Sequence, residues 1–269
     1  MKMAETLPEE CLCHVISFTS PADTCRLAAA SPAFRGAADS DLTWEKFLPL
    51  DYREILSRSV IPVQFSSKKD LFRQLSSAPV LLDGGKKTFV IDKSTNKKCY
   101  MLSARELSIA WSSNYMCWSW KPLLNSRFSE AAELIMVCWL EIHGRINTTM
   151  LSPKTTYGVY IVIQLMNRAF GLDKLPAEVS LQLDNYKTKN TIYLKREEHK
   201  EDVQGVEPRV VKENDVVRER GDTWLEVELG EFYYADDRNK EVRVWLRETK
   251  GVHLKGGLVV EGIEVRPKH

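Results

Sequence analysis

The chain of 269 residues lacks the features of a membrane, secreted or zinc-binding protein. No apolar run approaches the roughly 20 residues that cross a bilayer. The N-terminus is acidic, where a secretory signal would be basic and then apolar. The six cysteines form no C-x-x-C pair and have no histidine nearby at metal-ligand spacing, which argues against a zinc site and a disulfide framework. We therefore expect no membrane association and place the chain in the cytoplasm or nucleus.

The sequence also lacks the motifs that position a nucleophile, a base or a phosphate group. It has no H-E-x-x-H, no G-x-S-x-G and no G-x-x-x-x-G-K-[ST]. His143 on a predicted strand is more typical of a solvent-facing or hydrogen-bonded residue than of a general base. Glu226 and Glu228 alternate on one strand face, a spacing that any exposed strand produces. We expect no enzyme activity, no cofactor, no metal and no catalytic residue.

Charge is nearly balanced, with a formal net charge of +1. Binding to nucleic acid requires a clustered basic surface, so we expect no nucleic acid partner. Residues 1–50 hold four basic and seven acidic groups, whereas the remainder is net positive, which indicates two modules. Residues 195–222 carry seven basic and nine acidic groups and are predicted to form a solvated loop or an exposed hairpin.

The first 50 residues predict three or four short helices. Leu12, Val15 and Ile16 fall on one predicted helical face. Helices of two or three turns bury little apolar surface by themselves, so this unit requires a partner surface. Hydroxyl side chains stand where N-cap residues are expected, one or two residues before a proline at the helix start: Thr6, Ser20 and Ser31.

Two different patterns follow. Residues 51–88 predict a helical linker, with caps at Asp51 and Ser67, a loop near residues 60–67, and a turn before the next strand. From residue 89 onward, apolar and polar residues alternate in at least eight segments that are rich in β-branched and aromatic side chains. The predicted fold class is α+β, in which an antiparallel, jelly-roll-like β-sandwich occupies residues 89–269.

The segments L-P-E-E-C-L-C-H-V-I-S-F, S-P-A-F-R and D-L-T-W resemble the F-box, a helical motif that binds the Skp-type adaptor of cullin-based ubiquitin ligases. The resemblance covers residues 1–50 and implies that this region is a three-helix F-box. Cys11 and Ala30 depart from the usual larger residues of the motif. The residues that the resemblance assigns to apolar contact with the adaptor are Leu7, Pro8, Ile16, Leu27 and Trp44.

The second half is similar to the plant phloem protein 2 family, the family of the Nictaba-like lectins. The similarity lies in L-S-I-A-W, W-S-W, V-C-W-L-E-I-H-G-R-I, G-D-T-W-L-E-V-E-L-G-E-F and G-L-V-V-E-G-I-E-V-R-P. It implies binding of N-acetylglucosamine oligomers or N-glycan cores by Trp111 and Trp118, because an aromatic face stacks on the apolar face of a sugar ring. Trp120 is expected to pack inside the sandwich. Cys117 stands where lectin members have a tyrosine, and the S-S-N-Y-M loop is altered.

Together the two resemblances imply a plant substrate receptor of an SCF-type ubiquitin ligase. The F-box would bind the Skp-type adaptor, the sandwich would bind a glycoprotein or protein target, and the linker would act as a semi-rigid spacer. Two alternatives remain open at this point. The chain could be a lectin or stress-response protein that assembles no ligase, or the sandwich could recognise proteins through its edges or loops without any glycan.

Overall fold

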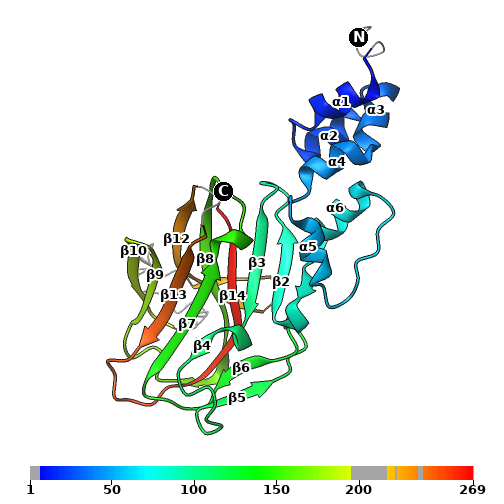
Figure 1. The fold of residues 1–269 in the computed structure, drawn as a ribbon. Helices are drawn as coiled ribbons and strands as arrows, with labels where there is room; N and C mark the ends of the chain where they lie inside the picture. Colours follow the sequence, from blue (N-terminus) through cyan, green and yellow to red (C-terminus); the bar gives the residue numbers. More distant parts are fainter. Residues whose placement is uncertain (1–6, 195–216, 222, 236–238, 269) are drawn as a thin grey trace, which may run out of the picture. The chain divides into compact units, whose positions relative to one another are not determined.

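The computed structural model describes residues 7–194, 217–221, 223–235 and 239–268. By their internal contacts these residues form two compact units, one ending at Tyr100 and the other covering Met101–Lys268. Figure 1 shows helices α1 to α6 in the first unit and most of the strands in the second. A helical N-terminal region followed by two antiparallel sheets confirms the predicted α+β fold class.

Four short helices open the first unit: α1 (Glu9–Ile16), α2 (Pro21–Leu27), α3 (Pro32–Asp39) and α4 (Asp41–Phe47). The predicted caps of α2 and α3 are confirmed, since Asp23 N donates to Ser20 Oγ at 3.0 Å and Phe34 N donates to Ser31 Oγ at 3.3 Å. Helix α1 begins differently from the prediction. Its N-cap position is Pro8, with no side-chain cap, and the expected cap Thr6 lies outside the described residues.

The helices enclose a small apolar core around Leu12, Cys13, Ile16 and Ala37. Val15 lies elsewhere, because its side chain is 57% exposed. The prediction that Leu12, Val15 and Ile16 share one buried face was therefore wrong for Val15. The core face of α1 runs through Leu12, Ile16 and Cys13. Val15 lies about 100° around the helix from Ile16, on the side away from Cys13, so it falls beyond the edge of this face.

The predicted linker is only partly helical. It contains α5 (Tyr52–Ser57) and α6 (Lys68–Ser77), then β1 (Val80–Leu82), a 3-10 turn η1 (Asp83–Gly85) and β2 (Lys87–Ile91). The Ser67 cap of α6 is confirmed by a 3.1 Å bond from Asp70 N. Asp51 occupies the N-cap position of α5, as predicted, but its side chain makes no cap bond and accepts from Lys98 Nζ at 3.0 Å instead. The β1–β2 hairpin was not predicted, since Val80, Leu81 and Leu82 are too few for a periodic signal.

Strand β3 (Lys98–Ser103) carries the chain from the first unit into the second. In the second unit, one sheet has the order β11, β12, β8, β14, with β6 beside β14 and β5 beside β6. The other sheet has the order β10, β9, β13, β7, β4. The bounds of these elements are η2 (Ala104–Glu106), β4 (Ser108–Ile109), β5 (Trp118–Lys121), β6 (Ala131–Leu134), β7 (Leu140–Asn147), η3 (Thr148–Met150), β8 (Thr155–Phe170), β9 (Ala177–Leu183), β10 (Tyr186–Ile192), β11 (Val217–Glu219), β12 (Leu225–Tyr234), β13 (Glu241–Glu248) and β14 (Gly256–Pro267).

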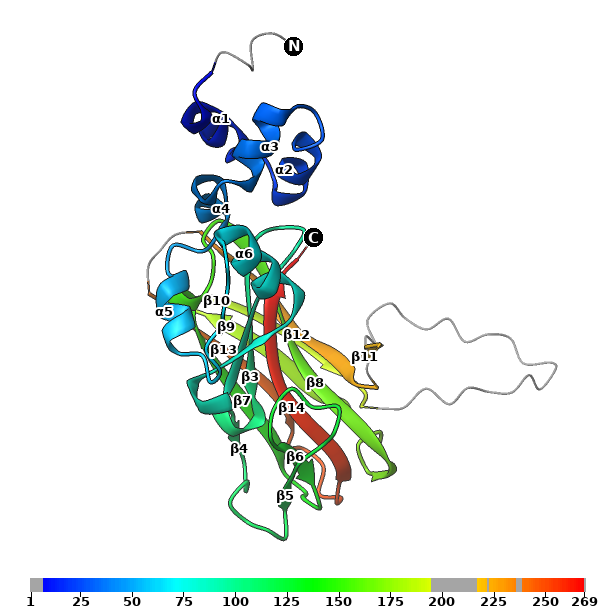
Figure 2. The ribbon, with the colours of Figure 1, turned by 90° about the vertical axis from the view of Figure 1, so that its right-hand side faces the viewer.

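Within the first of these sheets, β8 lies between β12 and β14 (Figures 1 and 2). Burial alternates along β7 and β13, as the period-two pattern predicted. At Gly230, a bulge in β12 with φ +151°, an added Cβ would lie 2.8 Å from Leu181 Cβ of the facing sheet. At Gly262 of β14 it would lie 2.0 Å from Leu102 O. Glycine permits close backbone approach at both places.

Two further expectations can be compared with the structure. The charged segment 195–222 lies mostly outside the described residues; its residues Val217–Glu219 form the edge strand β11. None of the helices in the described ranges has the length and apolar character of a membrane span. The three-way division at residues 50 and 88 stays a prediction.

Candidate functional site

Helix α1 carries a second apolar face that points away from its core. Val15 is 57% exposed and Phe18, just after the helix, is 78% exposed, and Cys11 is exposed as well. These three positions have the spacing i, i+4, i+7, so they lie along one side of the helix. Leu7, 48% exposed, and Pro8 precede them at the helix start. We call Leu7, Pro8, Cys11, Val15 and Phe18 the α1 stripe.

The residues predicted to contact the adaptor divide into two groups. Leu7 and Pro8 belong to the exposed α1 stripe. Ile16 is 0% exposed in the helical core, and Leu27 packs against the same core as a partly buried residue. Trp44 is 2% exposed, and its indole N–H donates to Ala38 O at 2.7 Å. Ile16 and Trp44 therefore hold the helices together and present no free face in this structure.

Trp44 also joins the first four helices to α6. Its ring centroid lies 5.5 Å from that of Phe47 and 5.3 Å from that of Phe72 on α6. Polar contacts reinforce this packing, because Lys68 N donates to Asp41 Oδ1 at 2.7 Å and Lys69 Nζ lies 2.6 Å from an Asp39 carboxylate oxygen. Helices α4 and α6 thus form one packed body.

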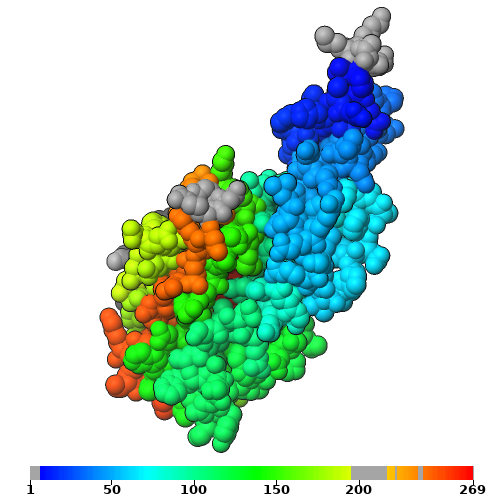
Figure 3. Space-filling view, in the orientation of Figure 1, coloured from blue at the N-terminus to red at the C-terminus, as the bar shows by residue number. Residues whose placement is uncertain are grey.

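In the second unit, the chain between β4 and β5 presents large apolar side chains to solvent. Trp111 has a left-handed backbone conformation, φ +66°, and is 59% exposed. A tight turn holds this conformation, since Asn114 N donates to Trp111 O at 2.9 Å. Tyr115 and Met116, 85% and 62% exposed, follow in the same loop. The green part of the chain that contains this loop lies at the surface in Figure 3.

The other two tryptophans of this segment are fixed in place. Trp118 is 2% exposed, and its indole N–H donates to Ala110 O at 2.9 Å, next to Trp111. Trp120 is partly buried, and its indole N–H donates to Ser112 O at 3.3 Å. The Arg105 guanidinium covers the Trp120 ring at 3.6 Å from its centroid. Both indoles therefore anchor the loop that carries Trp111.

A second loop, residues 135–139, continues this apolar surface. Ile135 N donates to Cys117 O at 2.8 Å, and Ala110 N donates to Glu141 O at 3.0 Å, so the two loops are joined at both ends. Trp139 is 47% exposed and donates its indole N–H to Glu141 Oε2 at 3.0 Å. The exposed residues of the two loops form what we call the loop surface: Trp111, Tyr115, Met116, Ile135, Met136 and Trp139. It combines aromatic faces with the Glu141 carboxylate, a set of groups that can bind a sugar or an apolar protein segment.

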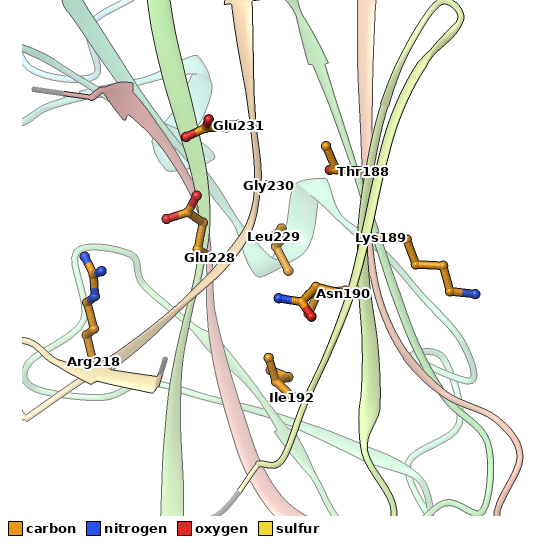
Figure 4. Close-up of a pocket in the computed structure, with 10 residues that line it drawn as sticks. Thr188, Lys189, Asn190, Ile192, Arg218, Glu228, Leu229, Gly230 and Glu231 are labelled. Carbon is orange, nitrogen blue, oxygen red and sulfur yellow. The ribbon is translucent and has the colours of Figure 1, made fainter. Parts of the chain in front are cut away.

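A pocket of about 350 Å³ lies at the β10 edge of the sandwich. Figure 4 shows Leu229, Asn190 and Ile192 close together between strands, with Glu228 and Arg218 on the side of β12 and β11. The buried Thr188 Oγ1 at the pocket makes no hydrogen bond within the described part of the chain. β10 and β4 are the two edges of one sheet, so this pocket is separate from the loop surface, which follows β4.

The residues that could suggest catalysis have structural partners. Glu226 binds Arg266 at 2.7 Å and Glu228 binds Lys268 at 2.8 Å. The His143 ring stacks on Trp245 with centroids 4.8 Å apart. Burial, followed by the nearby arginines, lowers the pKa of His143. Over residues 7–194, 217–221, 223–235 and 239–268, no group of three or more metal-binding side chains comes together.

Comparison with known families agrees with this architecture. The phloem protein 2 family model matches residues 97–267, and the F-box-like model matches residues 4–49. The chain belongs to the phloem protein 2 family. Three Arabidopsis thaliana relatives match nearly end to end, each over 97% of this chain. They are F-box protein PP2-B15 with 46% identity over 96% of its length, putative F-box protein PP2-B12 with 42% over 97%, and F-box protein PP2-B13 with 44% over 98%.

The chain thus joins an F-box-like region to a phloem protein 2 domain, as the F-box proteins among its relatives do over nearly their whole length. Sequence reasoning placed Trp111 and Trp118 in the phloem protein 2 domain, but it did not single out Trp139, Tyr115 or Met116. The V-C-W-L segment contained the signal for Trp139, because an apolar run that leads into a strand can leave one side chain outside the sandwich.

Proposed function

We propose that this phloem protein 2 family member is the substrate receptor of an SCF-type ubiquitin ligase and that the α1 stripe binds the Skp-type adaptor. The observation that carries the proposal is a helix with two apolar faces, of which one packs in the helical core and the other is exposed among the described residues. A row of exposed apolar side chains on a short helix is typical of a protein interaction surface.

The adaptor-binding residues then have two roles. Leu7 and Pro8 contact the adaptor directly, together with Val15 and Phe18. Ile16, Leu27 and Trp44 act indirectly, because they fix the position of α1 and of the helices packed against it. The packing of Trp44 against Phe72 supports a semi-rigid spacer after the F-box.

The adaptor proposal is tested with the full chain and purified Skp-type adaptor. Leu7→Asp and Phe18→Asp place a charge in the interface and are expected to abolish copurification, whereas both variants should fold because the positions are exposed. The control is Leu124→Asp, a leucine of the second unit that is 105% exposed. Unchanged recovery of adaptor by Leu7→Asp and Phe18→Asp would refute the ligase role and favour a lectin that assembles no ligase.

The loop surface is proposed to bind the target, with an N-acetylglucosamine oligomer or N-glycan core as the first candidate ligand. Trp111 offers an exposed ring for stacking, and Glu141 offers a carboxylate that can accept hydrogen bonds from sugar hydroxyls. A side chain that is 2% exposed presents no face to a sugar, so Trp118 is proposed to support Trp111 through its bond to Ala110 O.

The glycan proposal is tested by titrating chitin oligomers and a high-mannose glycan. Trp111→Ala is expected to lose binding while keeping the stability of the parent chain. Tyr233→Ala is the matched control, because Tyr233 is 58% exposed on β12 and Trp111 is 59% exposed. Equal binding by the parent chain and Trp111→Ala would remove the assigned role. Target binding that survives deglycosylation would favour the alternative, recognition of a protein surface.

The proposed receptor performs no group transfer itself. Its contribution is to raise the effective concentration of a target lysine near the charged ubiquitin carrier. Such a role is proposed for the cytoplasm and nucleus, where the ligase operates.

A further inference from the structure

The outer face of the five-stranded sheet carries an ordered array of polar side chains. Strand pairing aligns five residues into one row across the whole sheet: Ser108, His143, Trp245, Ser180 and Lys189. Their neighbours along each strand, such as Ile142, Val244 and Leu181, are buried on the opposite face against the other sheet. The row therefore belongs to the face that is not used for packing the sandwich.

The next row on the same face is cationic. Arg145 pairs with Arg243, Arg243 with Gln182, and Gln182 with Lys187. In this row, Arg243 has a carboxylate partner among the described residues, Glu241 at 2.6 Å. Arg145 and Lys187 make no ion pair within the described part of the chain. Strands are spaced about 4.8 Å apart, so these cations extend over roughly 14 Å.

The remaining row does not neutralise this charge. It holds Glu141, Arg247 and Glu178. Glu178 is already bound to Lys189 at 2.6 Å, and Glu141 accepts from the Trp139 indole. The three rows and the adjoining Glu241 contain three carboxylates against five cationic side chains: Arg145, Lys187, Lys189, Arg243 and Arg247.

Several buried polar atoms on this face have no hydrogen-bond partner among the described residues. They are Ser180 Oγ, His143 Nε2 and Arg247 Nε, and Ser180 as a whole is 0% exposed. Leaving a buried polar group unpaired costs about 1–3 kcal/mol. These atoms lie beneath the surface, so the exposed cations are the groups that a bound segment would contact. The Trp245 ring is occupied, since His143 stacks on it and Arg247 lies 5.0 Å from its centroid. Charge and hydrogen bonding, rather than stacking, are therefore what this face offers.

We propose that this face, centred on Arg145, Arg243 and Lys187, binds an acidic, extended segment of a protein partner. The inference rests on the proposed function, because it assigns part of target recognition to a second surface besides the loop surface. Four or five residues of an extended chain, at about 3.3 Å each, match the length of the cationic row. The excess of positive charge is complementary to carboxylates and favours their approach.

The test uses the full purified chain and a Glu-rich peptide of about ten residues, with its Gln counterpart as the uncharged probe. Arg145→Gln/Lys187→Gln removes two exposed cations that have no ion pair among the described residues and is expected to weaken binding of the Glu-rich peptide by about 2- to 30-fold, from two exposed ion pairs. The matched control is Lys154→Gln/Lys174→Gln, two exposed lysines of the same unit that lie off this face. The control should bind like the parent chain, and added salt should weaken binding.

The His143 ring supplies a second readout. Carboxylates bound beside it should raise its pKa in the parent chain, measured by NMR of the ring protons, and the Gln peptide should leave that pKa unchanged. Equal affinity for both peptides, or undiminished affinity in Arg145→Gln/Lys187→Gln, would overturn the proposal. An oligogalacturonate serves as the probe for acidic sugars. If Arg145→Gln/Lys187→Gln loses binding to the oligogalacturonate but keeps binding to the Glu-rich peptide, the face binds acidic sugars instead, which would also overturn the proposal. No adaptor is present in this assay, so its failure is distinct from failure of the ligase proposal, which the α1 stripe variants report.

Discussion

The buried ion pair between Lys255 and Glu248 is predicted to stabilise the second unit and to hold part of the loop surface in place. Lys255 is 0% exposed, and its ammonium group donates to three backbone carbonyl oxygens, those of Cys138, Gly251 at 3.4 Å and His253 at 3.3 Å. Its Nζ also lies 2.5 Å from Glu248 Oε2. At this distance the Glu248 carboxylate balances the charge of the buried ammonium group.

Replacing Lys255 by methionine keeps most of the volume and removes the charge. The Glu248 carboxylate would then remain buried without its cation, and three carbonyl oxygens would lose their donor. Breaking one partner of a buried pair costs about 3–5 kcal/mol. For a unit of this size that corresponds to a fall in Tm of roughly 6–20 °C.

Glu248→Gln is the reciprocal change. In the parent chain, Gly251 N donates to Glu248 Oε1 at 2.9 Å. The glutamine side-chain oxygen can still accept this bond, while the negative charge is lost. We expect a double-mutant cycle of Lys255→Met and Glu248→Gln, measured by denaturant unfolding, to give a coupling free energy of about 2 kcal/mol or more. Additive effects, or a loss below about 1 kcal/mol for Lys255→Met alone, would refute the reasoning.

The same lysine holds the loop that presents Met136 and Trp139. Val137 N donates to Lys255 O at 3.0 Å, and Lys255 N donates to Val137 O at 2.8 Å. Lys255→Met is therefore expected to accelerate hydrogen exchange at the Val137 amide more than at strand centres, which hydrogen–deuterium exchange would measure.

Four further predictions concern single sites. Ile16→Ala should destabilise the first unit by about 2–5 kcal/mol in calorimetry, because it empties a fully buried position. Trp118→Ala should cost about 3–5 kcal/mol in denaturant unfolding, whereas the exposed Trp111→Ala should stay within about 0.5 kcal/mol. Gly262→Ala should cost about 1–3 kcal/mol or more, since its Cβ would overlap Leu102 O. Burial raises the pKa of Glu261, so the folded state binds the proton more tightly than the unfolded state and this group's contribution to stability declines as pH rises above about 4. Glu261→Gln should therefore raise Tm at neutral pH, with the gain vanishing near pH 4.

Much of the fold could be predicted because its signals are local. The Ser20, Ser31 and Ser67 caps depend only on the next three residues, and the strands of the sandwich show a period of two. Asp51 has the same local appearance, but it binds Lys98, which is far away in the sequence. A long-range ion pair cannot be read from neighbouring residues.

The candidate sites were harder to predict because exposure depends on tertiary packing. Trp111 and Trp118 are both tryptophans beside predicted strands, yet one is 59% exposed and the other 2%. Val15 and Ile16 are adjacent apolar residues of α1, yet Val15 is 57% exposed and Ile16 is 0% exposed. The cationic row became visible only through strand register, which aligns residues from β7, β13, β9 and β10.

The most direct test of the division between adaptor binding and target binding is quantitative affinity purification of the full chain from plant cells under proteasome inhibition. The account predicts that Leu7→Asp loses the Skp-type adaptor and retains the target, and that Trp111→Ala retains the adaptor and loses the target. Loss of both partners in either variant, or of neither, would contradict it.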